Sequence, residues 1–378
     1  MAGLKALKGQ GHAPTLFAAF MYFDMSFMIW TLLGPLSAEI IESFANAGFI
    51  MTASQKATLL SLPILTGALL RIVLGFSVDK FGAKKTALAS QFIVILSLFY
   101  VAFLGAEITY NQLLIVAFFL GFAGASFAVA LPQAGQWYPP KLQGLVLGIA
   151  GAANFGVVMG FLFAPKIAEH YGWTSVFLVA GCLAIVLFIA YFLLAKDAPA
   201  DVYKARPKKL KDYGKLLKDK DTWWFNLFYA ISFGGFVGFG VFLKLFLTDT
   251  YPEEMKTLGL AWFTEDNVKV MAGYFGALCI FAGTVLRPIG GAIADKIGGV
   301  KSLYIHFTIV ALLMVVNATV ELSFPMVILV FFLTMANLGM ANGAVFQLVP
   351  QRFSRDIGVM VGIVGAAGGL GGTALIKT

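Results

Sequence analysis

The sequence predicts an all-α membrane protein with two pseudo-symmetric helix bundles, and both its composition and an internal repeat support this fold class. Of its 378 residues, 60% are hydrophobic and 12% are charged, and the mean hydropathy is +0.87. A soluble domain does not need so much apolar surface, and about 20 consecutive apolar residues span a bilayer. The 41 glycines agree with this class, because small residues let membrane helices approach closely.

Eleven apolar runs are predicted to form transmembrane helices. They are residues 14–41, 54–78, 86–106, 111–137, 143–166 and 173–195, and then 222–247, 270–294, 302–321, 325–350 and 357–376. A polar segment separates the sixth run from the seventh. We therefore expect an N-terminal six-helix bundle at 1–195, a linker at 196–221 and a C-terminal bundle of five helices at 222–378.

Basic residues are distributed unevenly over the alternate loops. With the N-terminus placed in the cytoplasm, 19 of the 27 lysines and arginines fall on the cytoplasmic side and 6 on the outer side, Lys244 among the latter. This asymmetry predicts a multi-pass protein of the cell inner (plasma) membrane whose N-terminus is cytoplasmic. The basic linker is expected to lie in solvent near anionic lipid, and no nucleic-acid partner is expected.

Only Arg71 and Arg287 remain after this count, and both lie in apolar runs. They stand in two phrases that align at an offset of 216 residues. The aligned glycines and acids are Gly75, Asp79 and Gly82 in the first phrase and Gly291, Asp295 and Gly298 in the second. A charge inside a bilayer is costly, so an arginine there indicates a functional site. A pair related by an internal repeat predicts one cationic site where the two halves meet.

The spacing to the aligned acids places both arginines near the middle of the bilayer. Arg71 precedes Asp79 by eight positions, which is about 12 Å along a helix, and the hydrocarbon half-thickness is about 15 Å. Arg287 and Asp295 repeat this spacing. We therefore expect the two guanidiniums to face each other across a central cavity; the alternative is that an acid of the same half neutralises each. Two buried cations repel unless an anion lies between them, and the guanidinium fork suits a planar oxyanion.

Three stretches of the sequence resemble the motifs of a known family. The phrase at 75–85, G-x-x-x-D-K-x-G-x-K-K, resembles the loop motif between the second and third helices of the major facilitator superfamily. Residues 124–154 and 336–372 resemble the two nitrate signatures of the nitrate/nitrite porter (NarK-type) family. The resemblance covers nearly the whole chain. It implies a major facilitator fold and secondary active transport of nitrate and nitrite by alternating access.

Two features depart from the family pattern. Ser126 stands where the first signature often has asparagine. The family has twelve helices, whereas this sequence contains eleven apolar runs, so the C-terminal bundle is expected to be truncated and to lack the last helix.

The resemblance also indicates which residues surround the two arginines. It implies that Tyr229 and Phe233, four residues apart on one face of the seventh helix, line the anion site. Phe127 is expected at the same depth. Asn154 and Asn342, expected well inside helices five and ten, either donate to the anion or join neighbouring helices.

Repeated glycines and acids are expected to serve the conformational change. The glycines expected to permit sliding contacts between helices are Gly148, Gly151, Gly362 and Gly365. The family implies that some of them expose backbone amides to the anion. Asp79 and Asp295, with the aligned glycines of their phrases, are expected to hold contacts of the cytoplasmic gate.

Asp24 is the one acid placed deep in a helix, about 15 Å from the cytoplasmic start of the first run. A buried carboxylate can carry a proton, and the rival interpretation is a permanent counter-charge to one of the arginines. The wording around Phe127 and Trp137, together with Asp24, resembles the proton-coupled nitrate uptake branch of the family. Nitrate/nitrite antiport is the alternative, followed by an organic-anion or phosphate-ester exchanger and a non-transporting sensor.

An enzyme is not expected. The three histidines, His12, His170 and His306, are scattered, and the two cysteines lie in separate apolar runs. These residues predict neither a metal site nor a catalytic cluster, and no cofactor is expected. The expected partners are nitrate, nitrite, protons as the candidate coupling ion, and the lipid bilayer, and the resemblance implies a monomer.

Overall fold

The computed structural model describes residues 9–139, 146, 154–199, 214, 216–257, 267–353 and 357–377. The regular structure of these residues is helical throughout, which confirms the all-α prediction. Ten helices of the described part are long and apolar enough to cross a membrane. The remaining expected helix, at 143–166, is described continuously only from Asn154, as α9 (Phe155–Tyr171, 17 residues), so the number eleven is not confirmed.

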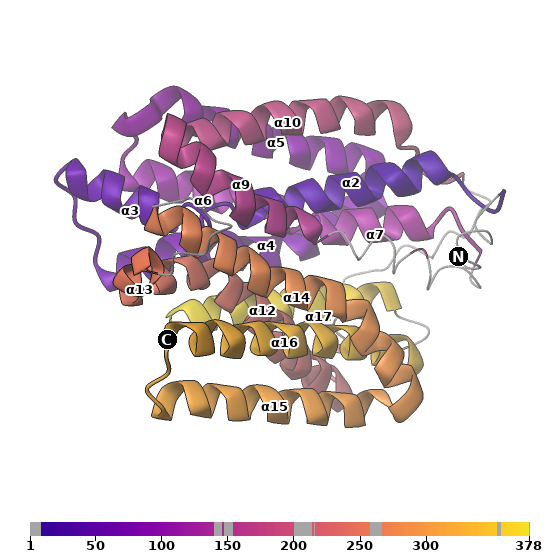
Figure 1. Ribbon diagram of the computed structural model, residues 1–378. Helices are drawn as coiled ribbons and strands as arrows, with labels where there is room; N and C mark the ends of the chain where they lie inside the picture. The colour runs from indigo at the N-terminus through magenta and orange to yellow at the C-terminus, as the bar shows by residue number, and fades with distance from the viewer. Residues whose placement is uncertain are drawn as a thin grey trace.

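Two groups of helices lie one above the other in Figure 1. The upper group, called here the N-terminal half, contains α2 (Ala13–Trp30), α3 (Ser37–Asn46), α4 (Ala53–Phe81), α5 (Ala83–Leu104), η1 (Gly105–Glu107), α6 (Tyr110–Gly124), α7 (Phe127–Gly135), α9 and α10 (Trp173–Leu194). The lower group, the C-terminal half, contains α12 (Lys220–Thr250), α13 (Pro252–Thr257), α14 (Val268–Ile297), α15 (Gly299–Thr319), α16 (Phe324–Arg352) and α17 (Ile357–Lys377).

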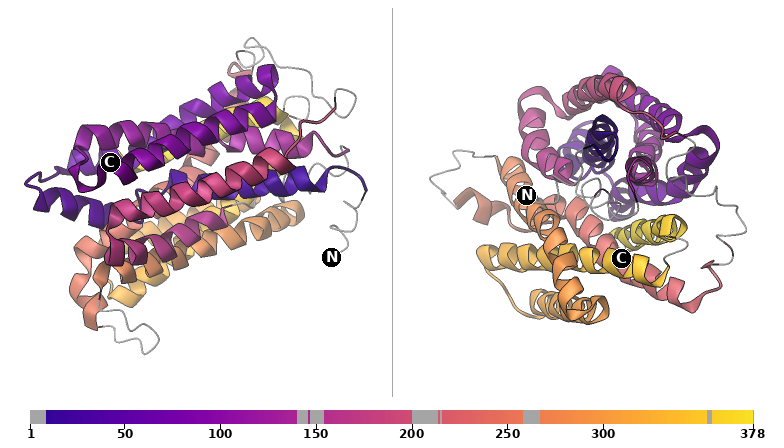
Figure 2. Two further views of the ribbon diagram at one scale, coloured as in Figure 1. Left: turned by 90° about the horizontal axis from the view of Figure 1, so that it is seen from above. Right: turned by 90° about the vertical axis from the view of Figure 1, so that its right-hand side faces the viewer.

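The long helices run alternately between two ends of the molecule, and the views in Figure 2 show them side by side and end on. We call the end at which α2 and α12 begin the linker end, and the other the opposite end. The described N-terminal residues lie at the linker end, and α17 finishes at the opposite end (Figure 1).

Gly82 and Gly298 join consecutive helices at equivalent points of the two halves. Gly82 separates α4 from α5 with φ 89°, and Gly298 separates α14 from α15 with φ 91°. Glycine adopts this left-handed region at little cost, because it has no Cβ. The repeated phrase therefore encodes the same helical corner twice, and its two acids, Asp79 and Asp295, are exposed at the linker end.

Two runs that were expected to be single helices are each broken. The run 14–41 forms α2 and α3, separated by turns at 31–36 that contain Pro35. Proline lacks an N–H and interrupts the helical hydrogen bonds. The run 111–137 forms α6 and α7, because the amide of Ala128 donates to Ala125, three residues back, and leaves the carbonyl of Gly124 free for another donor.

The seventh expected helix is longer than its apolar run. It was placed at 222–247, whereas α12 continues to Thr250. Lys244 falls within the expected run, although it was counted on the outer side, and in the structure its side chain is fully buried (0% exposed) inside α12. The assignment of Lys244 to the outer loops is therefore wrong.

The most extensive contacts between the two halves are those of α4 with α17 and of α9 with α14. Small residues allow this approach. A Cβ on Gly369 of α17 would lie 2.6 Å from the Cβ of Ala68, and one on Gly273 of α14 would lie 2.7 Å from the Cγ of Pro165. Side chains at these glycines would push the halves apart, so the glycines set the distance between them.

Candidate functional site

Arg71 lies in α4 at the contact between the two halves, and its side chain is 2% exposed. Its Nε donates to the carbonyl oxygen of Gly124 at 3.2 Å, and its Nη1 donates to the carbonyl oxygen of Gly365. Because Gly124 belongs to the N-terminal half and Gly365 to the C-terminal half, this one side chain joins them. The remaining nitrogen, Nη2, is buried and has no hydrogen-bond partner among the described residues.

The break between α6 and α7 explains why Gly124 can accept from Arg71. In an unbroken helix the Gly124 carbonyl would accept from the amide four residues ahead, that of Ala128. Here that amide donates to Ala125 at 3.0 Å, in a tighter turn. The carbonyl freed in this way points at a buried cation, so the break provides part of the site.

Three aromatic rings surround the guanidinium of Arg71. Its Cζ lies 5.5 Å from the ring of Trp30, 5.3 Å from that of Phe127 and 5.4 Å from that of Phe233. A cation within about 6 Å of a ring centroid is attracted by the electrons of the ring. Phe127 and Phe233 were expected here, whereas Trp30 was not.

Arg287, on α14, is half-buried, and its Cζ lies 5.5 Å from the ring of Phe346 on α16. Tyr229 contacts an aromatic neighbour of each arginine: its ring stacks on Phe233 at 4.9 Å and meets Phe346 edge to face at 5.0 Å. The two guanidiniums and the Tyr229 hydroxyl are close enough to interact electrostatically with one another. The structure thus brings Tyr229 and both arginines into one site.

Neither arginine forms an ion pair with a carboxylate in the part of the chain that the structure describes. The alternative that an acid of the same half neutralises each arginine therefore finds no support in this conformation. Two cations that share a site without an acidic partner repel each other, and an anion between them relieves that repulsion.

Asn154 and Asn342 are both buried, at 3% and 2% exposure. The side-chain oxygen of each lacks a hydrogen-bond donor among the described residues. Asn342 lies inside α16, as expected. Asn154 is not well inside a helix: it is the residue before α9, with φ −120° and ψ 2°. Among the described residues, neither asparagine forms a hydrogen bond with an arginine.

Asp24 contacts the start of α9. Its Oδ1 accepts from the amide of Gly156 at 2.8 Å, and a Cβ on Gly156 would lie 2.3 Å from the Asp24 carbonyl oxygen. The first amides of a helix lack partners within it, and a carboxylate there also interacts favourably with the helix dipole. Asp24 thus caps α9 from the neighbouring α2, and among the described residues it forms no ion pair with either arginine.

The expected glycines differ in what surrounds them. The Gly365 carbonyl accepts from Arg71, and a Cβ there would lie 3.3 Å from its Nη1, whereas a Cβ on Gly362 would meet no atom within 4 Å. Gly75 and Gly291 are partly buried, on α4 and α14. Gly148 and Gly151 lie outside the described residues.

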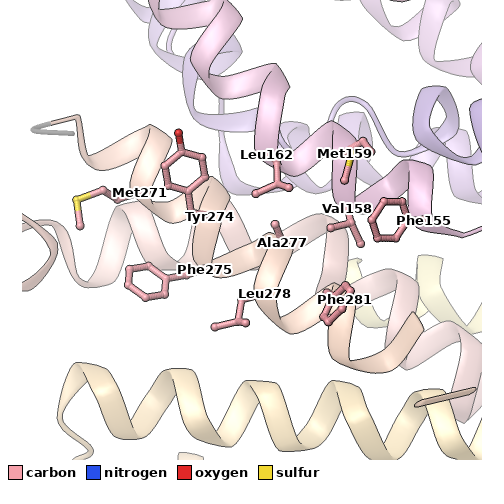
Figure 3. A pocket seen from close by; sticks show the side chains of 10 residues that line it. All are labelled: Phe155, Val158, Met159, Leu162, Met271, Tyr274, Phe275, Ala277, Leu278 and Phe281. Carbon is pink, nitrogen blue, oxygen red and sulfur yellow. The ribbon is translucent and has the colours of Figure 1, made fainter. Parts of the chain in front are cut away.

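A cavity of about 560 Å³ lies between α9 and α14, and its side chains are drawn in Figure 3. The lining is apolar except for one tyrosine hydroxyl: Phe155, Val158, Met159, Leu162, Met271, Tyr274, Phe275, Ala277, Leu278 and Phe281. Because no charged side chain lines it, this cavity is not suited to an anion. The arginine cluster is the better candidate.

Comparison with known proteins agrees with this architecture. The profile of the Major Facilitator Superfamily matches residues 15–375. A crystal structure of a bacterial homolog to the human lysosomal transporter Spinster, in an inward-facing and occupied conformation, is 18% identical, with a TM-score of 0.68 over 95% of this chain and 80% of that chain. At this identity the likeness shows the fold alone.

Relatives of higher identity carry names of one kind. The probable nitrate transporter NarT of Staphylococcus carnosus (strain TM300) is 35% identical over 92% of this chain and 82% of its own length. The nitrite extrusion protein of Bacillus subtilis (strain 168) is 31% identical over 92% of this chain and 81% of its own length. The probable nitrate/nitrite antiporter NarK1 of Thermus thermophilus is 27% identical over 94% and 82%. The chain belongs to the nitrate/nitrite porter family of the major facilitator superfamily, a family of membrane transporters and not of enzymes.

Proposed function

We propose that this protein carries nitrate and nitrite across a membrane by alternating access, with the anion bound between Arg71 and Arg287. The observation that carries this proposal is a pair of repeat-related arginines, brought into one site with no carboxylate partner among the described residues. The names of the relatives support nitrate and nitrite as the substrates.

The groups around the arginines favour a small planar anion. The Nη2 of Arg71 is free to donate, and the Tyr229 hydroxyl lies in the field of both guanidiniums. A guanidinium offers parallel N–H groups that match two oxygens of a planar anion. The rings of Phe127, Phe233 and Phe346 narrow the space beside these donors. This narrowing speaks against an organic anion or a phosphate ester.

Arg71 also links binding to the movement of the two halves. Its bond to Gly365 is made only when the C-terminal half lies against α4. An anion between the guanidiniums would reduce their repulsion and so favour the closed arrangement, which is what a carrier needs in order to reorient with its substrate. The halves that move are those expected at 1–195 and 222–378, and the linker 196–221 joins them. Asn154, Asn342 and the glycines of the two signatures lie beside the path of the anion through the protein.

Orientation and coupling complete the proposal. The linker end lies in the cytoplasm, because the basic residues gather at that end. The protein acts as a monomer in the inner membrane, as the family resemblance implies. Asp24 carries the coupling proton in nitrate uptake. Nitrate/nitrite antiport is the alternative, and the name of the Thermus relative favours it.

Flux into proteoliposomes tests the substrate. Purified protein should transport nitrate and nitrite with saturation and should not transport a phosphate ester. The variant Arg287→Gln should lose the flux while the protein stays monodisperse. Saturable transport of the phosphate ester, or none of nitrate and nitrite, would overturn the proposal.

A further inference from the structure

Lys244 on α12 is a second fully buried cation in addition to Arg71, and it lies outside the arginine cluster. Its side chain is 0% exposed, and its Nζ donates to both carboxylate oxygens of Glu39, each at 2.6 Å, and to the carbonyl oxygen of Pro35. Glu39 lies on α3 of the N-terminal half. The ion pair therefore crosses between the halves at the opposite end, where a buried charge is tolerated only because it is paired.

Lys244 shares a helix face with the residues of the arginine site. It follows Phe233 by eleven positions, which is three helical turns plus about 20°, and about 16 Å along the axis. Phe233 contacts the guanidinium of Arg71. The face of α12 that lines the anion site therefore continues to Lys244, in the direction of the opposite end.

The contacts around this ion pair close the opposite end in this conformation. A Cβ on Gly34, in the turn between α2 and α3, would lie 3.0 Å from the Cα of Val241, so the backbone of this turn packs directly on α12. A second ion pair, Lys269 with Glu42, also joins the halves at this end. When the halves separate here, Lys244 remains on α12 while Glu39 and Pro35 move away with the N-terminal half.

We propose that Lys244 forms a second anion subsite, for nitrate or nitrite, on the path between the arginines and the opposite end, and that Glu39 fills this subsite as an internal counter-ion while that end is closed. This inference rests on the proposed function and orientation, which make the opposite end the outer one. A carboxylate and a small oxyanion both present oxygens that share one negative charge, so the anion can replace Glu39 when the carboxylate withdraws. An ammonium is a compact charge without a fork. The subsite therefore attracts nitrate and nitrite alike and leaves the selection between anions to the arginines.

The Glu42–Lys269 pair supplies a matched control. It links the same two halves at the same end, but the side chains of Lys269 and Glu42 are 27% and 55% exposed. An exposed ion pair contributes little and is screened by salt. Removing it should change closure of this end slightly and should leave the affinity for the anion unchanged.

The experiment measures nitrate flux in proteoliposomes of known orientation, with nitrate added on either side. Lys244→Gln should raise the outer KM for nitrate about fivefold and leave the inner KM unchanged, because the lost cation lies only on the outer path. Glu39→Gln keeps Lys244 and removes its competitor, so its outer KM should equal that of the native protein or fall below it. Equal outer KM values in these two variants would overturn the proposal.

A charge exchange distinguishes an anion-binding role of Lys244 from an ion pair that only holds the opposite end closed. The double variant E39K/K244E restores the ion pair but places a carboxylate on α12, so its outer KM should stay at least as high as that of Lys244→Gln. A native outer KM in this variant would show that the pair only closes the end, and it would overturn the subsite. The control exchange E42K/K269E should leave both KM values at the native level. Absence of saturable nitrate flux in the native protein would instead refute the proposed function, before any variant is compared.

Discussion

Replacing Arg71 with lysine keeps the positive charge of the site and removes the guanidinium fork. In the structure Arg71 divides its donors among three tasks. Nε binds Gly124, Nη1 binds Gly365, and Nη2 is left for the anion. A lysine ammonium on a flexible stem cannot reach all three positions, because its three hydrogens share one nitrogen. It would serve the buried carbonyls or the anion, not both.

The size of the effect follows from the bonds lost. A hydrogen bond to a charged group contributes about 1.5–3 kcal/mol, so the loss of one such bond to the anion weakens binding about 10- to 150-fold. The shorter side chain of lysine would also weaken the cation–π contacts with Trp30, Phe127 and Phe233, each worth about 0.5–2 kcal/mol in full. We therefore expect Arg71→Lys to reduce nitrate transport nearly to background.

Nitrate counterflow into proteoliposomes measures this loss without any driving gradient. Arg287→Lys should also lose nitrate counterflow, because the second guanidinium donates to the anion from the other side. Arg352→Lys is the control: Arg352 pairs with Asp219 and Asp221 near the linker end, and its side chain is 49% exposed. Near-native counterflow in either Arg71→Lys or Arg287→Lys would refute recognition through the guanidinium fork.

Three further changes test separate parts of the site. Asp24→Asn keeps an oxygen that can accept from the first turn of α9, so it should still exchange nitrate for nitrite while losing accumulation driven by an imposed pH gradient; unchanged accumulation would mean that Asp24 is only a structural acid. Gly365→Ala places a Cβ 3.3 Å from Nη1 of Arg71 and should lower the affinity for nitrate, measured by thermal shift. Gly362→Ala is the control, because its Cβ would meet no atom within 4 Å. Equal losses of affinity in the two variants would contradict a role for the contact between Gly365 and Arg71. Phe346→Ala removes the ring over the second arginine, a contact of about 0.5–2 kcal/mol, and should raise the nitrate KM about 2- to 30-fold; a native KM would exclude Phe346 from the site.

Global features of the fold could be predicted from the sequence because they rest on long patterns. The apolar runs gave an all-α membrane protein, and the aligned phrases around Arg71 and Arg287 gave two related halves. The phrases also mark real corners, since Gly82 and Gly298 each adopt a positive φ between two helices. A spacing of eight residues predicts the same position for each arginine along its helix, because a helix has a fixed rise per residue.

The parts that could not be predicted depend on contacts between distant segments. Trp30 packs on Arg71, yet nothing local separates it from the other aromatic residues of the chain. Phe346 packs on Arg287 and lies in the stretch 336–372, but the motif alone did not assign it to the site. Lys244 stood near the end of an apolar run and looked like a residue of the outer loop, because its partner Glu39 lies 205 residues away. Backbone carbonyls such as that of Gly365 carry no residue signature at all.

The two helix breaks missed from the sequence have a common use. Between α6 and α7, the freed carbonyl of Gly124 accepts from the buried Arg71. Between α2 and α3, the carbonyl of Pro35 accepts from the buried Lys244. A continuous apolar run gives no reason to expect an interruption, and each interruption leaves backbone groups without helical partners. In a membrane such groups must be satisfied by protein. A buried lysine or arginine needs hydrogen-bond acceptors, and the free carbonyls need donors. Each helix break and its cation therefore satisfy each other's hydrogen-bonding groups. Local sequence rules fail at these two points because the cations that complete them come from other helices.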